Sequence, residues 1–506
     1  MFGGSFNPIH DGHIEIAARV REKYGLDRVL FMVANDPPHK KSADMARAEL
    51  RYEMARLALA GREGLEPCDL ELKRRGKSYS VDTLKILHEM YPDDRIFFIV
   101  GADMLLSMDK WYNAPELFRR AEFIAAGRPG SGGEAAMEEK ARTLKADYGA
   151  RVYPSGITGP DISSTDIRER IKGWRPVTEL MPYEAAEYIY QNGIYFPEDT
   201  DKIRQRLKAD LKPSRYAHTM RVMMKSIELA DKYGADSKKA ALAGLLHDCA
   251  KLTPEKQYEL AGEYGLDVSG MAQPIIHGPL GAERARRVFG VADEEVLSAI
   301  SCHTTCKSRM TALDKIVYLA DKIEQGRIYD GVEDIRRETD EDLDRGMARC
   351  IEHAIYHVEN EKGGKITPET YIALNEIKKG LEEMMTDTKE QVLKICELLY
   401  DKKALDIRAL NVADKTIIAE WFVVCSGRAT TQVRTLCDEI EDKAADMGLT
   451  VLRKEGYGEA RWIVLDFGHI LVHIFYPEER EFYNMERLWG DDPDKCISFS
   501  KEKGED

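Results

Sequence analysis

Apolar and polar positions follow two alternating patterns along the first 200 residues. Short apolar runs at 28–33, 95–100 and 122–126 have the length of buried strands, and amphipathic stretches such as 48–60 lie between them. Alternation of this kind is typical of a parallel sheet with helices on both faces. The pattern therefore predicts an α/β, Rossmann-like domain for this part of the chain.

The pattern changes after a polar break at 196–200. From about 200 to 384 the apolar positions recur at helical spacing, as at 220–233 and 311–325, and no stretch resembles a strand. A third region opens with a predicted helix at 388–400, and it continues with strands at 416–424, 462–467 and 470–475 and a helix at 430–447. We expect a multidomain protein: an α/β domain at 1–197, an all-α domain at 198–385 and a small mixed α/β domain at 386–506.

Composition narrows the possible partners. The net charge of −15 argues against a general nucleic-acid surface, so DNA is not an expected partner. No apolar run approaches the ~18 residues that span a bilayer, and no leader pattern opens the chain. The nine cysteines have no regular spacing, which is typical of thiols in a reducing compartment. We therefore expect a cytoplasmic protein without a membrane segment.

A glycine-rich stretch precedes the first predicted helix, 14–24. Gly3, Gly4, Ser5 and Phe6 lead to His10-Asp11-Gly12-His13, so two histidines lie at a helix N-terminus, where phosphate binds. A tight turn with two surface histidines would explain this motif alone. The distant run Ile162–Arg168 favours a phosphate site instead, because Ser163, Ser164 and Thr165 can cap a helix and bind phosphate, and Arg168 can grip a triphosphate.

These two motifs resemble the nucleotidyltransferase superfamily with H-x-G-H and I-S-S-T-x-x-R signatures, over residues 1–196. Three further stretches resemble nicotinate mononucleotide adenylyltransferases: Pro37-Pro38-His39-Lys40, Ser78–Thr83, and Gly101–Met104 with Trp111-Tyr112. The resemblance implies adenylyl transfer from ATP to nicotinate mononucleotide, with Mg²⁺, giving deamido-NAD and pyrophosphate. It implies in-line attack without a covalent enzyme intermediate, so that catalysis is positioning and charge stabilisation.

The same resemblance implies roles for individual residues. His10, His13, Lys40 and Arg168 would act on the phosphates, and Gly3, Gly4, Ser5, Phe6, Ser163, Ser164 and Thr165 would line the phosphate cradle. Gly101 and Asp103 would belong to the nucleotide pocket. Ser80 and Thr83 would lie near the nicotinate carboxylate, and Trp111 would stack on the pyridine ring. Members of the family begin with a longer apolar strand than Met1-Phe2, so we expect translation to start a few codons upstream.

The second region carries a spread set of metal-ligand residues: His218, His247, Asp248, His277, His303 and Asp321. Imidazoles and carboxylates together suit a borderline divalent metal or iron. Asp321 lies in the otherwise apolar run Tyr318–Ile323, where a carboxylate needs a partner.

This set resembles the HD superfamily of metal-dependent phosphohydrolases, over residues ~200–384. The stretches around His247, His277, His303 and Asp321 are similar to the subfamily that hydrolyses diadenosine tetraphosphate symmetrically to two ADP. The resemblance implies two metals, iron or manganese, that activate water for attack at phosphorus. His218, His247, Asp248 and Asp321 would hold one metal, and His277, His303 and a bridging Asp248 the other; Lys251 and Arg215 are candidates for phosphate contact.

Two other metal hypotheses are weaker. Cys302 and Cys306 flank His303 and would suit zinc, but incidental thiols are the better interpretation, and the family usually has a glycine at 306. His353 and His357 are four residues apart, yet a solvated helix face explains them.

The third region shows no nucleophile–base constellation, and strand alternation makes His473 a structural histidine. It resembles the ribosomal silencing factor family in stretches such as Glu420–Gly427, Trp462–Asp466 and Arg480–Trp489. The resemblance implies binding to a protein of the large ribosomal subunit that blocks subunit joining, with Trp462, Lys454 and Arg453 as candidate contacts.

Two alternatives stay open at this point. One enzymatic domain could be degenerate, which would make the chain chiefly a regulatory ribosome-binding protein. The HD domain could also act on another nucleoside polyphosphate or on cyclic nucleotides.

Overall fold

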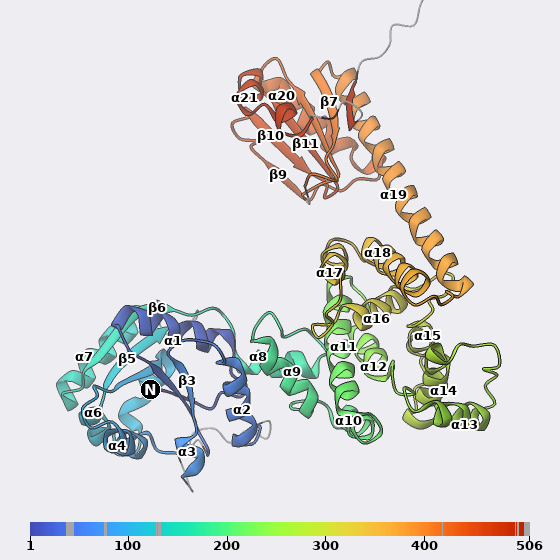
Figure 1. The fold of residues 1–506 in the computed structure, drawn as a ribbon. Helices are drawn as coiled ribbons and strands as arrows, with labels where there is room; N and C mark the ends of the chain where they lie inside the picture. Colours follow the sequence, from blue (N-terminus) through green and yellow to red (C-terminus); the bar gives the residue numbers. More distant parts are fainter. Residues whose placement is uncertain are drawn as a thin grey trace, which may run out of the picture. The chain divides into compact units, whose positions relative to one another are not determined.

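The computed structural model describes residues 1–36, 45–74, 78–127, 129, 133–416, 418–490, 492 and 495–499. The chain divides into two compact units, Met1–Arg336 and Arg337–Asp506. Figure 1 shows the elements of each unit in sequence colours. In the part of the chain that is described, no helix is long and apolar enough to cross a membrane.

The first unit begins with a six-stranded parallel sheet. Its strands are β1 (Phe2–Gly4), β2 (Val29–Val33), β3 (Leu65–Cys68), β4 (Phe97–Gly101), β5 (Glu122–Gly127) and β6 (Val152–Thr158), in the order β3-β2-β1-β4-β5-β6. β1 is central, since Phe2 pairs with Phe31 on one side and with Ile99 on the other. The Rossmann-like fold class is confirmed.

Helices connect these strands. They are α1 (Asp11–Tyr24), α2 (Ala48–Ala58), α3 (Leu70–Lys73), α4 (Ser80–Met90), α5 (Ala102–Ser107), η1 (Met108–Lys110), α6 (Ala114–Arg120), α7 (Gly133–Tyr148), α8 (Ser164–Lys172) and α9 (Tyr183–Asn192). Strands β2, β4 and β5 match the three apolar runs of the sequence. β3 and β6 escape that pattern because β3 has only four residues, Pro67 among them, and β6 contains Pro154 and the left-handed Gly156.

The rest of the first unit is helical, as expected. Its helices are α10 (Glu198–Asp210), α11 (Pro213–Lys232), α12 (Ser237–Leu246), α13 (Pro254–Tyr264), η2 (Gln273–Ile275), α14 (His277–Phe289), α15 (Glu294–Cys302), α16 (Ala312–Ile323) and the first part of α17 (Val332–Glu341). α11 packs against α12 and α16, and α12 and α16 both pack against α15. Together with α14, which packs against α15, these four helices contain or immediately precede the predicted ligand residues.

The second unit combines helices with a mixed sheet. Its elements include α18 (Leu343–Tyr356), η3 (His357–Glu361), α19 (Pro368–Asp401), β7 (Leu405–Asn411), β8 (Trp421–Ser426), α20 (Thr430–Lys443), η4 (Ala445–Met447), β9 (Arg453–Glu455), β10 (Trp462–Asp466), β11 (Ile470–Phe475), α21 (Pro477–Tyr483), α22 (Met485–Trp489) and β12 (Cys496–Ser498). The strand order is β12-β7-β8-β11-β10-β9, with β8 and β11 parallel and the other pairs antiparallel.

The sheet of this unit has two different faces. α19 and α20 cover one face, where Val392, Leu436 and Val472 belong to a large core. The opposite face carries a smaller cluster that includes Phe422 and Phe475 and contacts α22 through Met485 and Trp489. The helix predicted at 388–400 is the second half of α19, so the predicted border at 385–386 falls inside a continuous helix and remains a prediction.

Candidate active site and metal centre

The two histidines of the glycine-rich stretch lie at the N-terminus of α1, next to the end of β1. His10 caps the helix, and its backbone N–H lies 3.3 Å from Nδ1 of His13. The two rings are 3.7 Å apart between centroids. A 14-residue helix therefore directs its positive end, with both imidazoles, to one place.

The second motif contacts this turn although the bonded residues are 156 and 161 positions apart in the sequence. Ser163 caps α8 by accepting from the backbone N–H of Asp166 at 3.0 Å. Ser164 Oγ donates to the carbonyl of Pro8 at 2.8 Å, and Arg168 Nη1 donates to the carbonyl of Asn7 at 2.8 Å. Thr165 Oγ1 lies 3.3 Å from Arg168 Nη2. The predicted pairing of the two phosphate motifs is thus a set of direct hydrogen bonds.

A cavity of about 420 Å³ opens beside this turn, large enough for a mononucleotide. Of the residues predicted for the site, it is lined by Gly3, Gly4, Ser5, Ser80, Asp103 and Trp111. Sequence reasoning assigned no role to Tyr79 and Tyr112, which also line the cavity with ring centroids 4.4 Å apart. The sequence indicated a role for these two tyrosines only in that they adjoin Ser80 and Trp111.

Other predicted residues lie elsewhere. Thr83 is fully buried and donates its hydroxyl to Glu71 Oε1 at 2.6 Å, and Glu71 is the partner that reaches the cavity. Phe6 is buried against the ring of His13, 5.0 Å away, and so supports the turn from behind. Gly101 caps the start of α5, one helical turn ahead of Met104. Lys40, with the rest of Pro37–Lys40, lies outside the described residues.

Arg51 of α2 is a residue that the sequence did not single out. It is 1% exposed and donates to three backbone carbonyls: Ser5 at 2.6 Å, Asn35 at 3.1 Å and Ala46 at 2.8 Å. Burial lowers the pKa of Arg51. Its guanidinium ties the glycine-rich turn to the segment after β2, and it places a buried positive charge behind the phosphate cradle.

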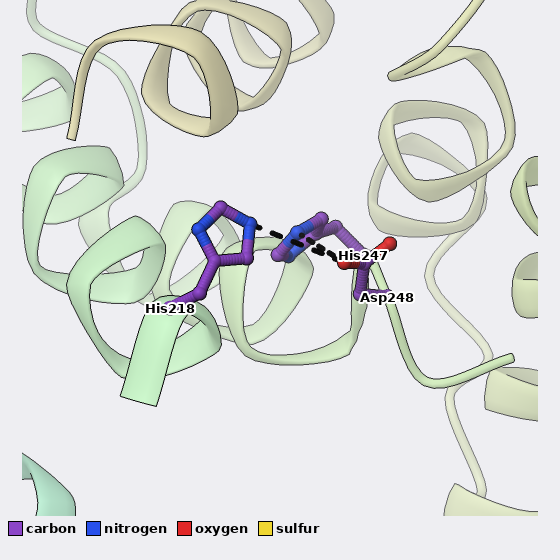
Figure 2. A group of neighbouring side chains, drawn as sticks. All are labelled: His218, His247 and Asp248. Carbon is purple, nitrogen blue, oxygen red and sulfur yellow. Dashed lines mark ion pairs between the residues drawn. The ribbon is translucent and has the colours of Figure 1, made fainter. Parts of the chain in front are cut away.

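The six predicted metal ligands of the helical region come together in one buried cluster. His218 comes from α11, His247 and Asp248 follow α12, His277 begins α14, His303 follows α15, and Asp321 lies in α16. All six are less than 8% exposed. Figure 2 shows His218 and His247 turned towards the carboxylate of Asp248.

The two oxygens of Asp248 face two different groups of histidines. Oδ2 lies 4.0 Å from His218 Nε2 and 3.5 Å from His247 Nε2. Oδ1 lies 3.2 Å from His277 Nε2 and 3.7 Å from His303 Nε2. Asp321 Oδ1 joins the first group, 3.0 Å from His218 Nε2. The two groups have the same members as the two ligand sets that the resemblance implied, and their binding of two metals remains a prediction.

Hydrogen bonds outside the cluster orient three of the histidines. Nδ1 of His247 lies 2.8 Å from the carbonyl of Gly244, and Nδ1 of His303 lies 2.7 Å from the carbonyl of Ile300. Nδ1 of His218 lies 3.0 Å from Glu324 Oε1. In each case Nδ1 is the donor that these acceptors require, which leaves Nε2 free to coordinate a metal.

The protonation of the cluster suits metal binding. Burial by itself would raise the pKa of Asp248, but His247, His277 and His303 hold the pKa well below its usual range. Burial lowers the pKa of His277 to about 4 and also lowers the pKa of His303. At neutral pH the His277 and His303 imidazoles are therefore uncharged and the Asp248 carboxylate is ionised, which are the forms that bind metals. The donor set therefore fits divalent metal ions.

Four cationic side chains end at the same cluster. Arg215 Nη1 donates to Asp248 Oδ2 at 2.8 Å, Arg327 Nη2 donates to Asp321 Oδ1 at 2.6 Å, and Lys322 pairs with Asp321. Lys251 Nζ lies 3.1 Å from His277 Nδ1. This concentration of positive charge around the cluster suits an anionic, phosphate-rich substrate.

The weaker metal hypotheses gain no support. Burial raises the pKa of both Cys302 and Cys306, which disfavours the thiolate that zinc requires. Cys306 has a φ of +60°, a left-handed conformation that explains why a glycine is usual there. His357 pairs with Glu361 on an exposed surface.

The parallel sheet with its phosphate cradle defines a nucleotidyltransferase class of protein, and the helical cluster defines an HD-type metal centre. Three family models match the chain: cytidylyltransferase-like at residues 1–170, HD domain at 215–326, and ribosomal silencing factor during starvation at 385–506. The chain belongs to the nicotinate-nucleotide adenylyltransferase family, to which it adds the other two modules.

The relatives that carry this assignment cover the first module. A probable nicotinate-nucleotide adenylyltransferase of Gloeobacter violaceus is 39% identical over 196 residues, which are 38% of this chain and 94% of the relative. The nicotinate-nucleotide adenylyltransferase of Bacillus subtilis is 37% identical over 195 residues, 38% of this chain and 96% of the relative.

Two solved structures also match parts of the chain. A Clostridium acetobutylicum protein described as a predicted HD superfamily hydrolase involved in NAD metabolism is 38% identical, covering 35% of this chain and 96% of its own, with a TM-score of 0.34. The Plasmodium falciparum nicotinic acid mononucleotide adenylyltransferase complexed with NaAD is 17% identical, covering 38% of this chain and 95% of its own, with a TM-score of 0.32.

Proposed function

We propose that the first module transfers the adenylyl group of ATP to nicotinate mononucleotide, giving deamido-NAD and pyrophosphate. The observation that carries the proposal is the cavity lined by Trp111 and Ser80, which opens beside the turn that bears His10. An indole and two tyrosines suit a flat pyridine ring, and the helix N-terminus suits the phosphates. The identity to adenylyltransferases supports the same substrates.

The residues of the turn would act by position and charge. His10 and His13 donate to the phosphoryl oxygens that gain charge during transfer, and Arg168, held by Asn7, completes the cradle. Lys40 remains a predicted phosphate ligand. Mg²⁺, when bound with ATP, would neutralise the phosphates and favour pyrophosphate as leaving group.

The test is to supply ATP, nicotinate mononucleotide and Mg²⁺ to the full chain and measure pyrophosphate and deamido-NAD. Nicotinamide mononucleotide, which lacks the carboxylate, is the matched control substrate. We expect release with the acid and much slower release with the amide. No release with either substrate would contradict the proposal and favour a binding module.

We further propose that the HD module is a metal-dependent phosphohydrolase that cleaves diadenosine tetraphosphate to two ADP. The carrying observation is Asp248, with one oxygen towards His218 and His247 and the other towards His277 and His303. Iron or manganese held there would supply Lewis-acid activation of water. Arg215, Lys251, Lys322 and Arg327 would bind the polyphosphate.

Product analysis tests the substrate and the cleavage site together. Diadenosine tetraphosphate is incubated with the full chain and Mn²⁺ or Fe²⁺, and we expect ADP alone. ATP with AMP would contradict symmetrical cleavage. Hydrolysis of another nucleoside polyphosphate, with no action on diadenosine tetraphosphate, would favour the alternative substrate class.

We also propose that the third module binds a protein of the large ribosomal subunit and blocks subunit joining. Besides the family match, α21 and α22 present Phe482 and Leu488, 80% and 66% exposed, among the carboxylates of Glu478 and Glu481. Exposed apolar side chains with acidic neighbours suit a basic ribosomal protein.

Co-sedimentation of the full chain with isolated large and small subunits tests this proposal. We expect it to pellet with large subunits, and we expect Phe482→Ser with Leu488→Ser to reduce the bound fraction. Ile418→Ser, at an equally exposed apolar position between β7 and β8, is the control. Equal binding to both subunits, or none, would contradict the proposal.

A further inference from the structure

A helix of the predicted adenylyltransferase domain reaches the surroundings of the metal-ligand cluster. α9 (Tyr183–Asn192) precedes the HD match at 215–326 and packs against α11. Its Glu187 accepts from Arg221 of α11, with Oε1 3.0 Å from Nη1. Gln191, one helical turn further along α9, donates from Nε2 to the same Glu187 oxygen at 2.8 Å.

Arg221 is connected to the predicted ligand His218 through Glu324. Its Nε lies 2.6 Å from Oε2 of Glu324, the residue that follows α16. Oε1 of Glu324 lies 3.0 Å from Nδ1 of His218, whose Nε2 faces Asp248 and Asp321. Glu187, Arg221, Glu324 and His218 therefore form one unbroken chain of polar contacts.

Burial increases along this chain towards the metal cluster. The side chains of Glu187 and Arg221 are 21% and 20% exposed, whereas that of Glu324 is 1% exposed. A guanidinium fork lies between two carboxylates, an arrangement that a lysine could not reproduce because it lacks the planar pair of donors. Glu324 is thus held by a group whose own position depends on α9.

Contacts at both of its ends fix α9 to the adenylyltransferase site. Before the helix, the backbone N–H of Asp11 donates to the carbonyl of Leu180 at 3.0 Å. After it, the hydroxyl of Tyr195 donates to Asn7 Oδ1 at 2.7 Å. The element that presents Glu187 is therefore anchored to the phosphate-binding turn itself.

We propose that Glu187 is a positioning residue of the HD metal centre: acting through Arg221 and Glu324, it holds the His218 imidazole with Nε2 towards the metal. The proposal rests on the metal-dependent function proposed above. It implies that the adenylyltransferase module completes the outer support of the metal centre, so the two modules form one functional unit and are more than neighbours on a chain.

Metal affinity tests this role without reliance on turnover. Mn²⁺ is titrated into the metal-stripped full chain, and free Mn²⁺ is followed by electron paramagnetic resonance. Loss of a partner to a metal-binding histidine weakens metal affinity about 10- to 100-fold, so we expect that range for Glu324→Gln and roughly 3- to 10-fold for Glu187→Gln, which acts further out. Glu184→Gln, exposed on the same helix, is the matched control and should bind as wild type.

A double-mutant cycle shows whether Glu187 acts through Arg221. In an Arg221→Gln background, Glu187→Gln should weaken Mn²⁺ binding no further. Adenylyl transfer and the far-ultraviolet circular dichroism of Glu187→Gln should equal those of wild type. If Glu187→Gln does not fold, Arg221→Lys tests the same chain of contacts, because it keeps the charge but loses the planar pair of donors. Its Mn²⁺ affinity should then also be lower than that of wild type.

Two results would overturn the proposal. Mn²⁺ affinity of Glu187→Gln equal to that of Glu184→Gln would leave Glu187 as an ordinary ion-pair residue between helices. A wild-type chain that binds no Mn²⁺ would overturn the metal-centre proposal, and this inference with it. A weakened Glu187→Gln beside a wild type that binds metal but leaves diadenosine tetraphosphate intact would support the inference and contradict only the proposed substrate.

Discussion

The adenylyltransferase site and the metal-ligand cluster of the first unit are built in opposite ways. The first lies where a short central strand ends, and much of its cradle is backbone: Gly3, Gly4 and the N-terminus of α1. The second contains no such turn. Its predicted ligands lie in or directly after helices between α11 and α16, all are buried, and three of the imidazoles are oriented by hydrogen bonds from Nδ1.

The difference teaches what each chemistry requires. A nucleotide has its own shape and charge, so an open cavity with phosphate donors is enough to bind it. A pair of metals needs side-chain atoms converging within a few ångströms, which requires a rigid, buried frame. Loss of metal and loss of single side chains should therefore affect the two sites differently.

Metal removal should separate the sites most strongly. A chelator followed by return of Mg²⁺ alone should abolish hydrolysis of diadenosine tetraphosphate and leave adenylyl transfer intact. Mg²⁺ prefers oxygen ligands and sheds water reluctantly, so it is a poor replacement at a cluster of four imidazoles. Adding Mn²⁺ should restore hydrolysis; full hydrolysis with Mg²⁺ alone would show that the imidazoles do not select the metal.

His13→Ala should act on the other site alone. Removing one donor to a developing phosphoryl charge lowers kcat about 10²- to 10³-fold. Hydrolysis of diadenosine tetraphosphate by the same preparation is the internal control and should not change. Steady-state assays of both reactions give the comparison, and an equal fall in both would point to a folding defect.

Trp111→Ala should have a milder effect, because the ring binds substrate and takes no part in bond formation. We expect KM for nicotinate mononucleotide to rise about 10-fold with little change in kcat, as for the loss of one aromatic stacking partner. KM for ATP should stay constant. A fall in kcat with unchanged KM would remove Trp111 from the pyridine pocket.

His473 lies outside both sites, and its titration should change the free energy of unfolding by the smallest amount of these predictions. Burial lowers the pKa of His473 to about 4, below the ordinary 6.5. Between these two pH values the imidazole is protonated in the unfolded chain and neutral in the folded chain. The contribution of His473 to the free energy of unfolding is therefore fully present well above pH 6.5, and it falls as the pH drops towards 4. Between pH 7 and pH 6 the loss is about 0.7 kcal/mol.

Hydrogen exchange of β10 and β11 at these two pH values measures that loss, corrected for the intrinsic pH dependence of exchange. His473→Gln, which keeps a neutral polar side chain beside Trp462, should remove this component. If wild type and variant lose equal stability over this range, His473 does not titrate as described.

Much of the fold and the ligand sets could be predicted from the sequence, because long apolar runs and ligand histidines are local signals. His247 and Asp248 are adjacent, and their partners lie in recognisable stretches. What escaped depends on tertiary contacts. Glu324 and Arg51 look like ordinary charged residues in the sequence, and only packing shows Glu324 at His218 and Arg51 at three carbonyls.

Thr83 shows the converse case, a residue that the sequence predicts for the site and that tertiary packing places in the core. Its position in Ser78–Thr83 suggested a place at the nicotinate carboxylate, yet helix α4 turns Ser80 to the cavity and Thr83 into the core. Each residue of a helix is rotated by about 100° from the one before, so positions 80 and 83 point about 60° apart. A motif therefore predicts which helix lines a site more securely than it predicts which side chain of that helix does.

Two reactions are thus assigned to two distinct sites of one chain, each with its own reacting residues. Asp248→Asn tests this assignment most directly, because Asp248 touches both groups of histidines and lies outside the adenylyltransferase cavity. Both activities are measured on one preparation of the full chain. We predict that hydrolysis of diadenosine tetraphosphate falls by more than about 100-fold, beyond the loss from an outer partner alone, while formation of deamido-NAD stays at the wild-type rate. Hydrolysis that persists in Asp248→Asn, or deamido-NAD synthesis that is lost with it, would contradict the assignment.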